Sequence, residues 1–112
     1  SRSTGCIVVC SGKTDIITDG EKAVCIRNGR AMMGCLTGTG CMLSGILGCF
    51  LTVENSVDSA AAAVMAMGIA GEIGASKLKE GEGNATLRTY LIDALFNMTD
   101  EELEKSGKYE VQ

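Results

Sequence analysis

The sequence predicts an α/β fold, and three observations support this prediction. A continuous apolar run near the N-terminus is typical of a buried strand, two β-rich runs follow it, and four segments with helical patterns occupy most of the remaining chain. The 112 residues correspond to one domain or to part of one. Hydrophobic residues make up 46% of the chain and aromatic residues only 4%, so small aliphatic side chains must fill the core.

The strand patterns lie in the N-terminal part of the chain. Cys6–Cys10 is apolar, which predicts a strand buried on both faces, as in a parallel sheet. Asp15–Thr18 and Lys22–Arg27 are separated by the turn residues Asp19-Gly20-Glu21, and this order predicts a β-hairpin. Asn28-Gly29 predicts a second turn directly after the hairpin.

A glycine-containing loop separates the strand region from the first long helix. We expect Arg30–Leu36 to be extended and partly buried, and Thr37–Cys41 to form a loop that opens a helix over Met42–Val53. This helix carries no charge and is apolar nearly all round, so we expect it to be a central helix.

Three more helices are predicted in the C-terminal half. Asp58 can cap a helix over Ser59–Lys79, and Asn84 can cap the next one, along which leucines recur on one face. Thr99 and Glu102 have the spacing of a capping box, which predicts a short last helix.

We expect Lys108–Val111 to complete the pattern as an edge strand. One strand, a hairpin and four helices provide too few strands to close a sheet of this class. We therefore expect the chain to be the C-terminal portion of something larger.

Composition excludes several classes of function. A net charge of −4 without a basic run argues against a nucleic-acid partner. The chain has no histidine, which excludes histidine-based triads and Cys/His zinc sites. Its six cysteines include no Cys-x-x-Cys pair and match no metal-ligand spacing, so no metal site is expected in this chain and reduced thiols of a cytoplasmic protein are the favoured interpretation.

No membrane segment is expected. Ala31–Val53 is uncharged and long enough to cross a bilayer, but Thr-Gly-Thr-Gly interrupts it and leaves too short a helix. No signal peptide is expected either, because the first apolar run is too short.

Thr37-Gly38-Thr39-Gly40-Cys41 is the candidate functional motif. Two glycines allow backbone N–H groups to approach a ligand, and the helix that follows adds the positive end of its dipole, so an anion such as a phosphate can bind there. A glycine turn that only allows close helix packing remains the alternative. Gly12-Lys13-Thr14 also resembles the end of a P-loop, but Ile7 stands where that motif needs glycine and a hairpin follows where it needs a helix.

An ordered set of segments resembles the C-terminal part of hydroxyethylthiazole kinase, a member of the ribokinase-like superfamily. The segments that carry the resemblance are Val9–Asp15, Thr18-Asp19-Gly20, Arg27-Asn28-Gly29, Thr37–Leu43 and Tyr90–Phe96. The resemblance implies a partial ribokinase-like fold with a central strand, a β-hairpin and several packed helices. It also implies ATP- and Mg²⁺-dependent phosphorylation of the hydroxyl of 4-methyl-5-(2-hydroxyethyl)thiazole.

The resemblance assigns roles to five residues. Cys41 stands where ribokinase-like kinases generally carry aspartate, beside the substrate hydroxyl, and would take or relay its proton. Gly38 would contact the substrate, while Thr39 and Gly40 would present N–H groups to the ATP phosphates. Ser11 would contact the nucleotide phosphates, with a simple strand-end turn as the alternative. A free thiol is a poor base at neutral pH, so positioning and charge stabilisation are expected to supply most of the rate.

The resemblance also implies partners. Residues 1–112 would form the nucleotide-side portion of one kinase domain whose N-terminal half, with the thiazole pocket and the magnesium ligands, lies outside this chain. Family members are similar in forming trimers, so a homotrimer is expected. Two alternatives stay open: another ribokinase-like kinase of vitamin precursors, and a non-catalytic assembly module.

Overall fold

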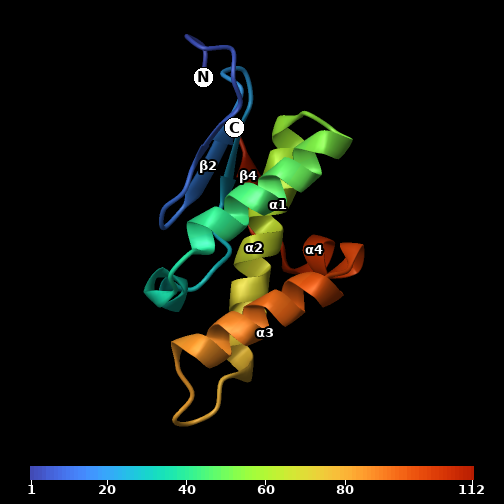
Figure 1. Ribbon diagram of the computed structural model, residues 1–112. Coiled ribbons are helices and arrows are strands. Elements are labelled where there is room, and N and C mark those ends of the chain that lie inside the picture. The colour runs from blue at the N-terminus through green and yellow to red at the C-terminus, as the bar shows by residue number, and fades with distance from the viewer.

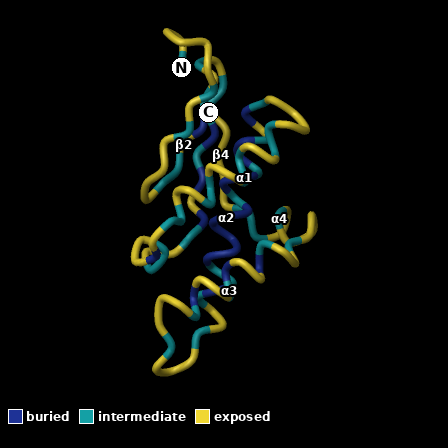
Figure 2. Tube along the Cα trace, viewed as in Figure 1, coloured by how far each residue is buried: buried dark blue, intermediate teal, exposed yellow.

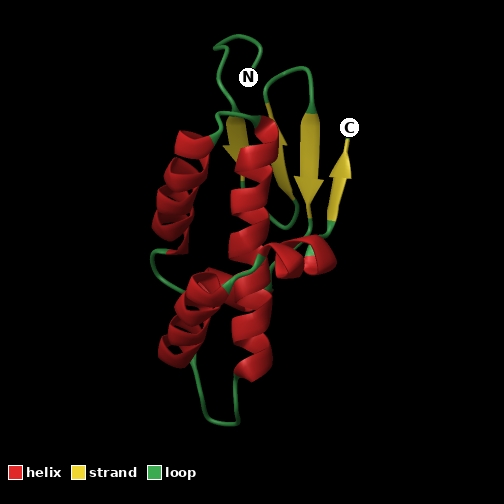
Figure 3. Cartoon of the chain, turned by 90° about the vertical axis from the view of Figure 1, so that its right-hand side faces the viewer, coloured by secondary structure: helices red, strands yellow, loops and turns green.

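The computed structural model describes residues 1–112 as a four-stranded sheet with helices packed on one of its faces (Figures 1 and 3). The elements in chain order are β1 (Val8–Cys10), β2 (Asp15–Thr18), β3 (Ala23–Ile26), the 3-10 helix η1 (Ala31–Cys35), α1 (Thr39–Val53), α2 (Val57–Lys77), α3 (Asn84–Asn97), α4 (Asp100–Ser106) and β4 (Tyr109–Val111). The predicted α/β class and the predicted number of α-helices are therefore confirmed.

The predicted hairpin is confirmed. β2 and β3 pair antiparallel, with Ile17 opposite Val24, and both side chains are buried beneath the helices. Ile16 points to the other face of the sheet and stays 43% exposed. This alternation follows from the two-residue period of a strand with one covered face. The predicted edge strand is also confirmed, since β4 pairs antiparallel with β3.

The environment predicted for the first strand is wrong in this chain. β1 pairs antiparallel with β2 at the edge of the sheet, and Val8 and Cys10 are exposed rather than buried. A strand that resembles a central one thus has a single neighbour among the described residues. Its other edge and one of its faces have nothing packed against them, which explains the exposure.

α2 is the central helix of the chain (Figure 2). Its N-terminal half packs on the sheet, where Ala60 and Val64 meet Ile17 and Ile26 in one core cluster. Its C-terminal half extends beyond the sheet and packs against α3 in a second cluster. α2 is also long and apolar enough to cross a membrane by length and composition, but 61% of its apolar window is buried within the chain, as in the core helix of a globular protein.

α1 differs from its prediction in two ways. It begins at Thr39, three residues before the predicted start, so Thr39, Gly40 and Cys41 belong to its first turn. The predicted central position is wrong, because α1 has no buried residue and contributes only half-buried side chains to the two clusters. α1 packs mainly against α2 and leaves the rest of its apolar surface uncovered.

Arg30–Leu36 is not extended as predicted. Its residues form η1, in which Met33 N–H donates to the Arg30 carbonyl and Leu36 N–H donates to the Met33 carbonyl. Met33 packs against the second cluster, and Leu36 is buried within it. A tight turn therefore satisfies the backbone and packs two apolar side chains against the second cluster at the same time.

The predicted helix caps are partly correct. The Thr99–Glu102 capping box of α4 is confirmed. α2 is capped by Ser56, which accepts from Ser59 N–H, and not by Asp58. Asn84 is the first residue of α3, and its amide donates to the Cys35 carbonyl instead of capping the helix.

Candidate functional site

A polar cleft of about 720 Å³ lies between the β1–β2 loop, the segment after β3 and the N-terminus of α1. Three predicted site residues line this cleft: Ser11 from the β1–β2 loop, and Thr39 and Gly40 from the first turn of α1. Gly38 and Cys41 flank them in sequence but do not line it. The cleft therefore brings together three of the five predicted site residues.

The first turn of α1 supplies unpaired backbone donors. Gly38 is the N-cap with a φ of 89°, which favours glycine, and its carbonyl accepts the first helical hydrogen bond from Met42 N–H at 2.9 Å. Thr39, Gly40 and Cys41 precede that bond, and no side chain caps the helix. Their N–H groups, together with the helix dipole, can stabilise an anion.

Three cationic side chains line the cleft, and the sequence motifs had not identified them as site residues. Arg27 is held by Glu110 through two hydrogen bonds of 2.8 and 3.2 Å, so its charge is already matched. Lys13 and Arg30 form no ion pair and are exposed. The available positive charge of the cleft therefore comes from these two side chains.

Lys13 belongs to the rejected P-loop sequence. The rejection is correct as to the motif, because β2 follows Gly12-Lys13-Thr14 where a P-loop needs a helix. The loop nevertheless carries Lys13 to the cleft from the side opposite α1. The sequence shows a lysine beside the end of a strand, which could have marked Lys13 as a candidate site residue. Only the fold shows that Lys13 lines the same cleft as Gly40.

Asp15 is the only carboxylate that lines the cleft. Burial raises the pKa of the Asp15 carboxyl, and the hydrogen bond that it accepts from Gly12 N–H at 2.9 Å opposes part of this rise. The same hydrogen bond fixes the turn Ser11-Gly12-Lys13. Asp15 thus shapes the loop that presents Ser11 and Lys13.

The Asn28-Gly29 turn forms another wall of the cleft, and the chain bends at Gly29, where a turn was predicted, with a φ of 118°. Asn28 is the only buried polar residue of the chain. Its side chain donates to the Ser106 carbonyl at 2.9 Å and accepts from Lys108 N–H at 2.7 Å. This wall is therefore tied to the connection between α4 and β4.

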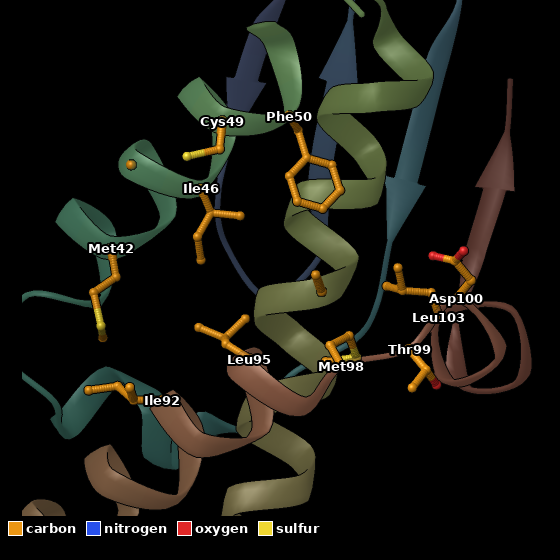
Figure 4. A pocket seen from close by; sticks show the side chains of 12 residues that line it. Met42, Ile46, Cys49, Phe50, Ile92, Leu95, Met98, Thr99, Asp100 and Leu103 are labelled. Carbon is orange, nitrogen blue, oxygen red and sulfur yellow. The ribbon is translucent and has the colours of Figure 1, made fainter. Parts of the chain in front are cut away.

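A second cavity, of about 650 Å³, has a different chemistry (Figure 4). It lies between α1, α3 and α4, and Figure 4 shows Met42, Ile46 and Leu95 around it. Asp100 is the only charged residue in its lining. A phosphate would be repelled by that carboxylate, so the polar cleft is the better anion site.

All six cysteines are free thiols, and five of them are exposed. Cys41 is one of the exposed thiols and follows Gly40 directly in the first turn of α1. Because Gly40 lines the cleft, a substrate that contacts the N-terminus of α1 would approach Cys41.

Fold and cleft together define an α/β protein with a candidate anion-binding cleft at a helix N-terminus. The comparisons with known proteins identify it further. The chain belongs to the hydroxyethylthiazole kinase family, whose family model matches residues 1–101.

Individual relatives agree with this assignment. The chain is 38% identical over 112 residues to a hydroxyethylthiazole kinase of Clostridium acetobutylicum, covering 98% of this chain and 41% of that protein. It is 39% identical over 102 residues to hydroxyethylthiazole kinase 2 of Methanosphaera stadtmanae, covering 90% of this chain and 36% of that protein. The structure of a hydroxyethylthiazole kinase protein from Pyrococcus horikoshii OT3 superposes with a TM-score of 0.91 at 25% identity, over 99% of this chain and 42% of that one.

The chain thus spans about two fifths of the length of the relatives that it matches. The expected partial ribokinase-like fold is consistent with the superposition. The short sheet and the uncovered surface of α1 are what a portion of a longer fold would present.

Proposed function

We propose that these 112 residues form the nucleotide-side portion of a kinase that transfers a phosphoryl group from ATP to the hydroxyl of 4-methyl-5-(2-hydroxyethyl)thiazole, in thiamine biosynthesis and salvage. One observation carries the proposal: uncapped N–H groups of α1 and the unpaired cations Lys13 and Arg30 line the same cleft, in a chain of the hydroxyethylthiazole kinase family. Both features suit a polyphosphate.

The proposed mechanism assigns each site residue a task. The N–H groups of Thr39 and Gly40 hold the terminal phosphate and stabilise the charge that spreads over its oxygens during transfer. The Ser11 hydroxyl binds the nucleotide phosphates from the opposite wall. Gly38 contacts the substrate alcohol, and the Cys41 thiol beside it takes or relays the hydroxyl proton.

Mg²⁺ would neutralise the phosphate oxygens during transfer, and we propose that most of its protein ligands lie outside this chain. The chain holds no group of three or more side chains suited to a metal ion, and Asp15 is the one carboxylate of the cleft. Mg²⁺ is usually held by one or two carboxylates together with the phosphates. We therefore assign its other ligands to the N-terminal half of the kinase.

The proposed partners follow from the uncovered surfaces. α1 exposes Gly45, Gly48 and Cys49, and its last residue Val53 is 89% exposed. The N-terminal half of the kinase, or a neighbouring subunit of a homotrimer, would cover this surface in a cytoplasmic enzyme. The same exposed surface favours the second candidate, a non-catalytic assembly module in which packing is the only role of these helices.

The direct test is a kinase assay on the complete protein, meaning the longer polypeptide that contains these residues. We expect ATP-dependent formation of the thiazole phosphate, with other vitamin-precursor alcohols phosphorylated much more slowly. A preference for a pyrimidine or pyridine alcohol would favour another ribokinase-like kinase. Absence of phosphorylation with every alcohol, with the trimer intact, would favour the assembly module.

The isolated 112 residues are expected to show no thiazole-dependent ATP turnover. They cover about two fifths of the related kinases, and the proposed thiazole pocket and magnesium ligands lie outside them. Turnover can be followed as thiazole-dependent release of ADP. Detectable turnover by a homogeneous preparation of the fragment would contradict the proposal that the thiazole pocket and the magnesium ligands lie outside these residues.

Replacing Lys13 or Arg30 with alanine in the complete kinase is expected to raise the KM for ATP roughly three- to tenfold, because each loses a charge-assisted contact that is exposed and partly screened. The KM for the alcohol should stay unchanged. Lys79→Ala and Arg88→Ala serve as matched controls, since both side chains are exposed and make no hydrogen bond or ion pair. Equal effects in all four variants would exclude a local role for the two cleft cations.

A further inference from the structure

Glu72 lies outside the cleft, on the face of α2 behind the Asn28-Gly29 turn, and its side chain is only 17% exposed. Three different groups donate hydrogen bonds to its carboxylate. Gly29 N–H and Lys108 Nζ donate at 3.0 Å, and the Asn28 amide donates at 3.4 Å. No residue of the chain other than Glu72 binds Gly29 N–H.

Resting on the function proposed above, we infer that Glu72 is a positioning residue for nucleotide binding: its carboxylate holds the Asn28-Gly29 turn, and that turn forms one wall of the phosphate cleft. Glu72 does not line the cleft itself. Its influence on the nucleotide is therefore transmitted through the main chain of Gly29.

The turn needs such support because its conformation is demanding. Gly29 adopts a φ of 118°, and Asn28 is buried against the backbone of α2 at Gly68. A flexible glycine at the cleft wall gains many conformations once its N–H loses its acceptor. The side chain of Asn28 is held by Ser106, Lys108 and Glu72, but only Glu72 accepts a hydrogen bond from the peptide N–H of Gly29.

The electrostatics of Glu72 suit this task. Burial alone would raise the pKa of the Glu72 carboxyl, but hydrogen bonds from Gly29 N–H, Lys108 and Asn28 outweigh it and bring the pKa below its ordinary value. The carboxylate thus stays ionised at neutral pH. An ionised acceptor makes the stronger hydrogen bond to the Gly29 amide.

The test compares Glu72→Ala, Glu72→Gln and the matched control Glu80→Gln in the complete kinase; Glu80 is exposed and makes no hydrogen bond. Steady-state kinetics gives kcat and the KM values for ATP and for the thiazole alcohol. Calorimetric titration with ATP gives the affinity independently of turnover. Hydrogen exchange at the Gly29 amide reports the turn directly and needs no activity.

We expect Glu72→Ala to raise the KM and Kd for ATP roughly 10- to 100-fold, as for loss of a hydrogen bond to a charged group. The KM for the alcohol should change little, and exchange at Gly29 should be faster. Glu72→Gln keeps an acceptor for Gly29 N–H, so it should recover most of the ATP affinity. Glu80→Gln should match the unmodified enzyme.

Other outcomes would overturn the inference. Equal changes in the KM values for ATP and for the alcohol would indicate a general structural role of Glu72. Unchanged ATP affinity together with faster exchange at Gly29 would show that the conformation of the turn does not affect nucleotide binding. If both Glu72 variants fail to fold, Glu72 is a folding residue and the inference is wrong. If the unmodified protein binds ATP but does not phosphorylate the thiazole, the proposed function fails while the ATP titrations still decide the role of Glu72. If it does not bind ATP, both fail.

Discussion

Cys41→Ala in the complete kinase is expected to lower kcat by roughly 100-fold, the scale on which a positioned proton acceptor contributes. Cys41 is exposed in the first turn of α1, directly after Gly40 of the cleft wall. In a loose transition state the hydroxyl is deprotonated late, so the loss should affect kcat more than the KM for ATP. The measurement is steady-state turnover with both substrates varied.

The matched control is Cys35→Ala, since Cys35 is an exposed thiol that does not line the polar cleft. It should leave kcat unchanged. If Cys41→Ala keeps full activity but loses the trimer, the assembly module would replace the kinase as the preferred function.

Cys41→Asp distinguishes a proton acceptor from a residue that only fills space. Because carboxylates are ionised at neutral pH and thiols are mostly protonated, the aspartate variant should retain or exceed the activity of the unmodified enzyme. A folded but inactive Cys41→Asp enzyme would exclude proton acceptance by residue 41.

Gly68→Ala is expected to have the largest effect on stability, about 1–3 kcal/mol of unfolding free energy, as for overpacking in a rigid environment. A Cβ at Gly68 would lie 2.7 Å from Asn28 Cβ and 2.9 Å from its backbone carbon. Backbone atoms cannot rotate away, so α2 and the Asn28-Gly29 turn would have to separate. Urea unfolding gives the stability, and the KM for ATP should rise as the cleft wall moves.

Gly71→Ala is the matched comparison, one turn further along α2. The three atoms nearest to its Cβ would all belong to the side chain of Met33, which is flexible and can change rotamer. The expected destabilisation is therefore smaller than for Gly68→Ala. If Gly71→Ala proves the more destabilising of the two, the close approach of the Asn28 backbone to Gly68 does not determine the cost of adding a Cβ on this face of α2.

The hairpin and the last capping box show what local patterns predict well. Asp19-Gly20-Glu21 and the β-rich runs beside it determine β2 and β3 through turn geometry. Thr99 and Glu102 determine the start of α4 through two reciprocal hydrogen bonds. Such features depend on a few neighbouring residues, so sequence alone contains the necessary information.

η1 and α1 show where local patterns are insufficient. The residues of η1 have an apolar pattern compatible with an extended segment, and only the packing of Met33 and Leu36 on the second cluster selects a tight turn. The uncharged pattern of α1 predicted a central helix, yet its environment depends on what covers it. An apolar pattern predicts that a helix surface is buried, but it does not identify the element that packs against that surface.

By itself, the sequence determined the α/β class, the hairpin, the helix-opening glycine loop and the resemblance to a thiazole kinase, because each depends on patterns within short segments of the chain. Only the tertiary structure decided that Lys13 and Arg30 share a cleft with Thr39 and Gly40, and that Glu72 supports Gly29. The residues that meet are separated by up to 43 positions along the chain, and the packing of α2 on the sheet brings them together. Long-range contacts of this kind arise from the whole fold, so no local pattern can specify them.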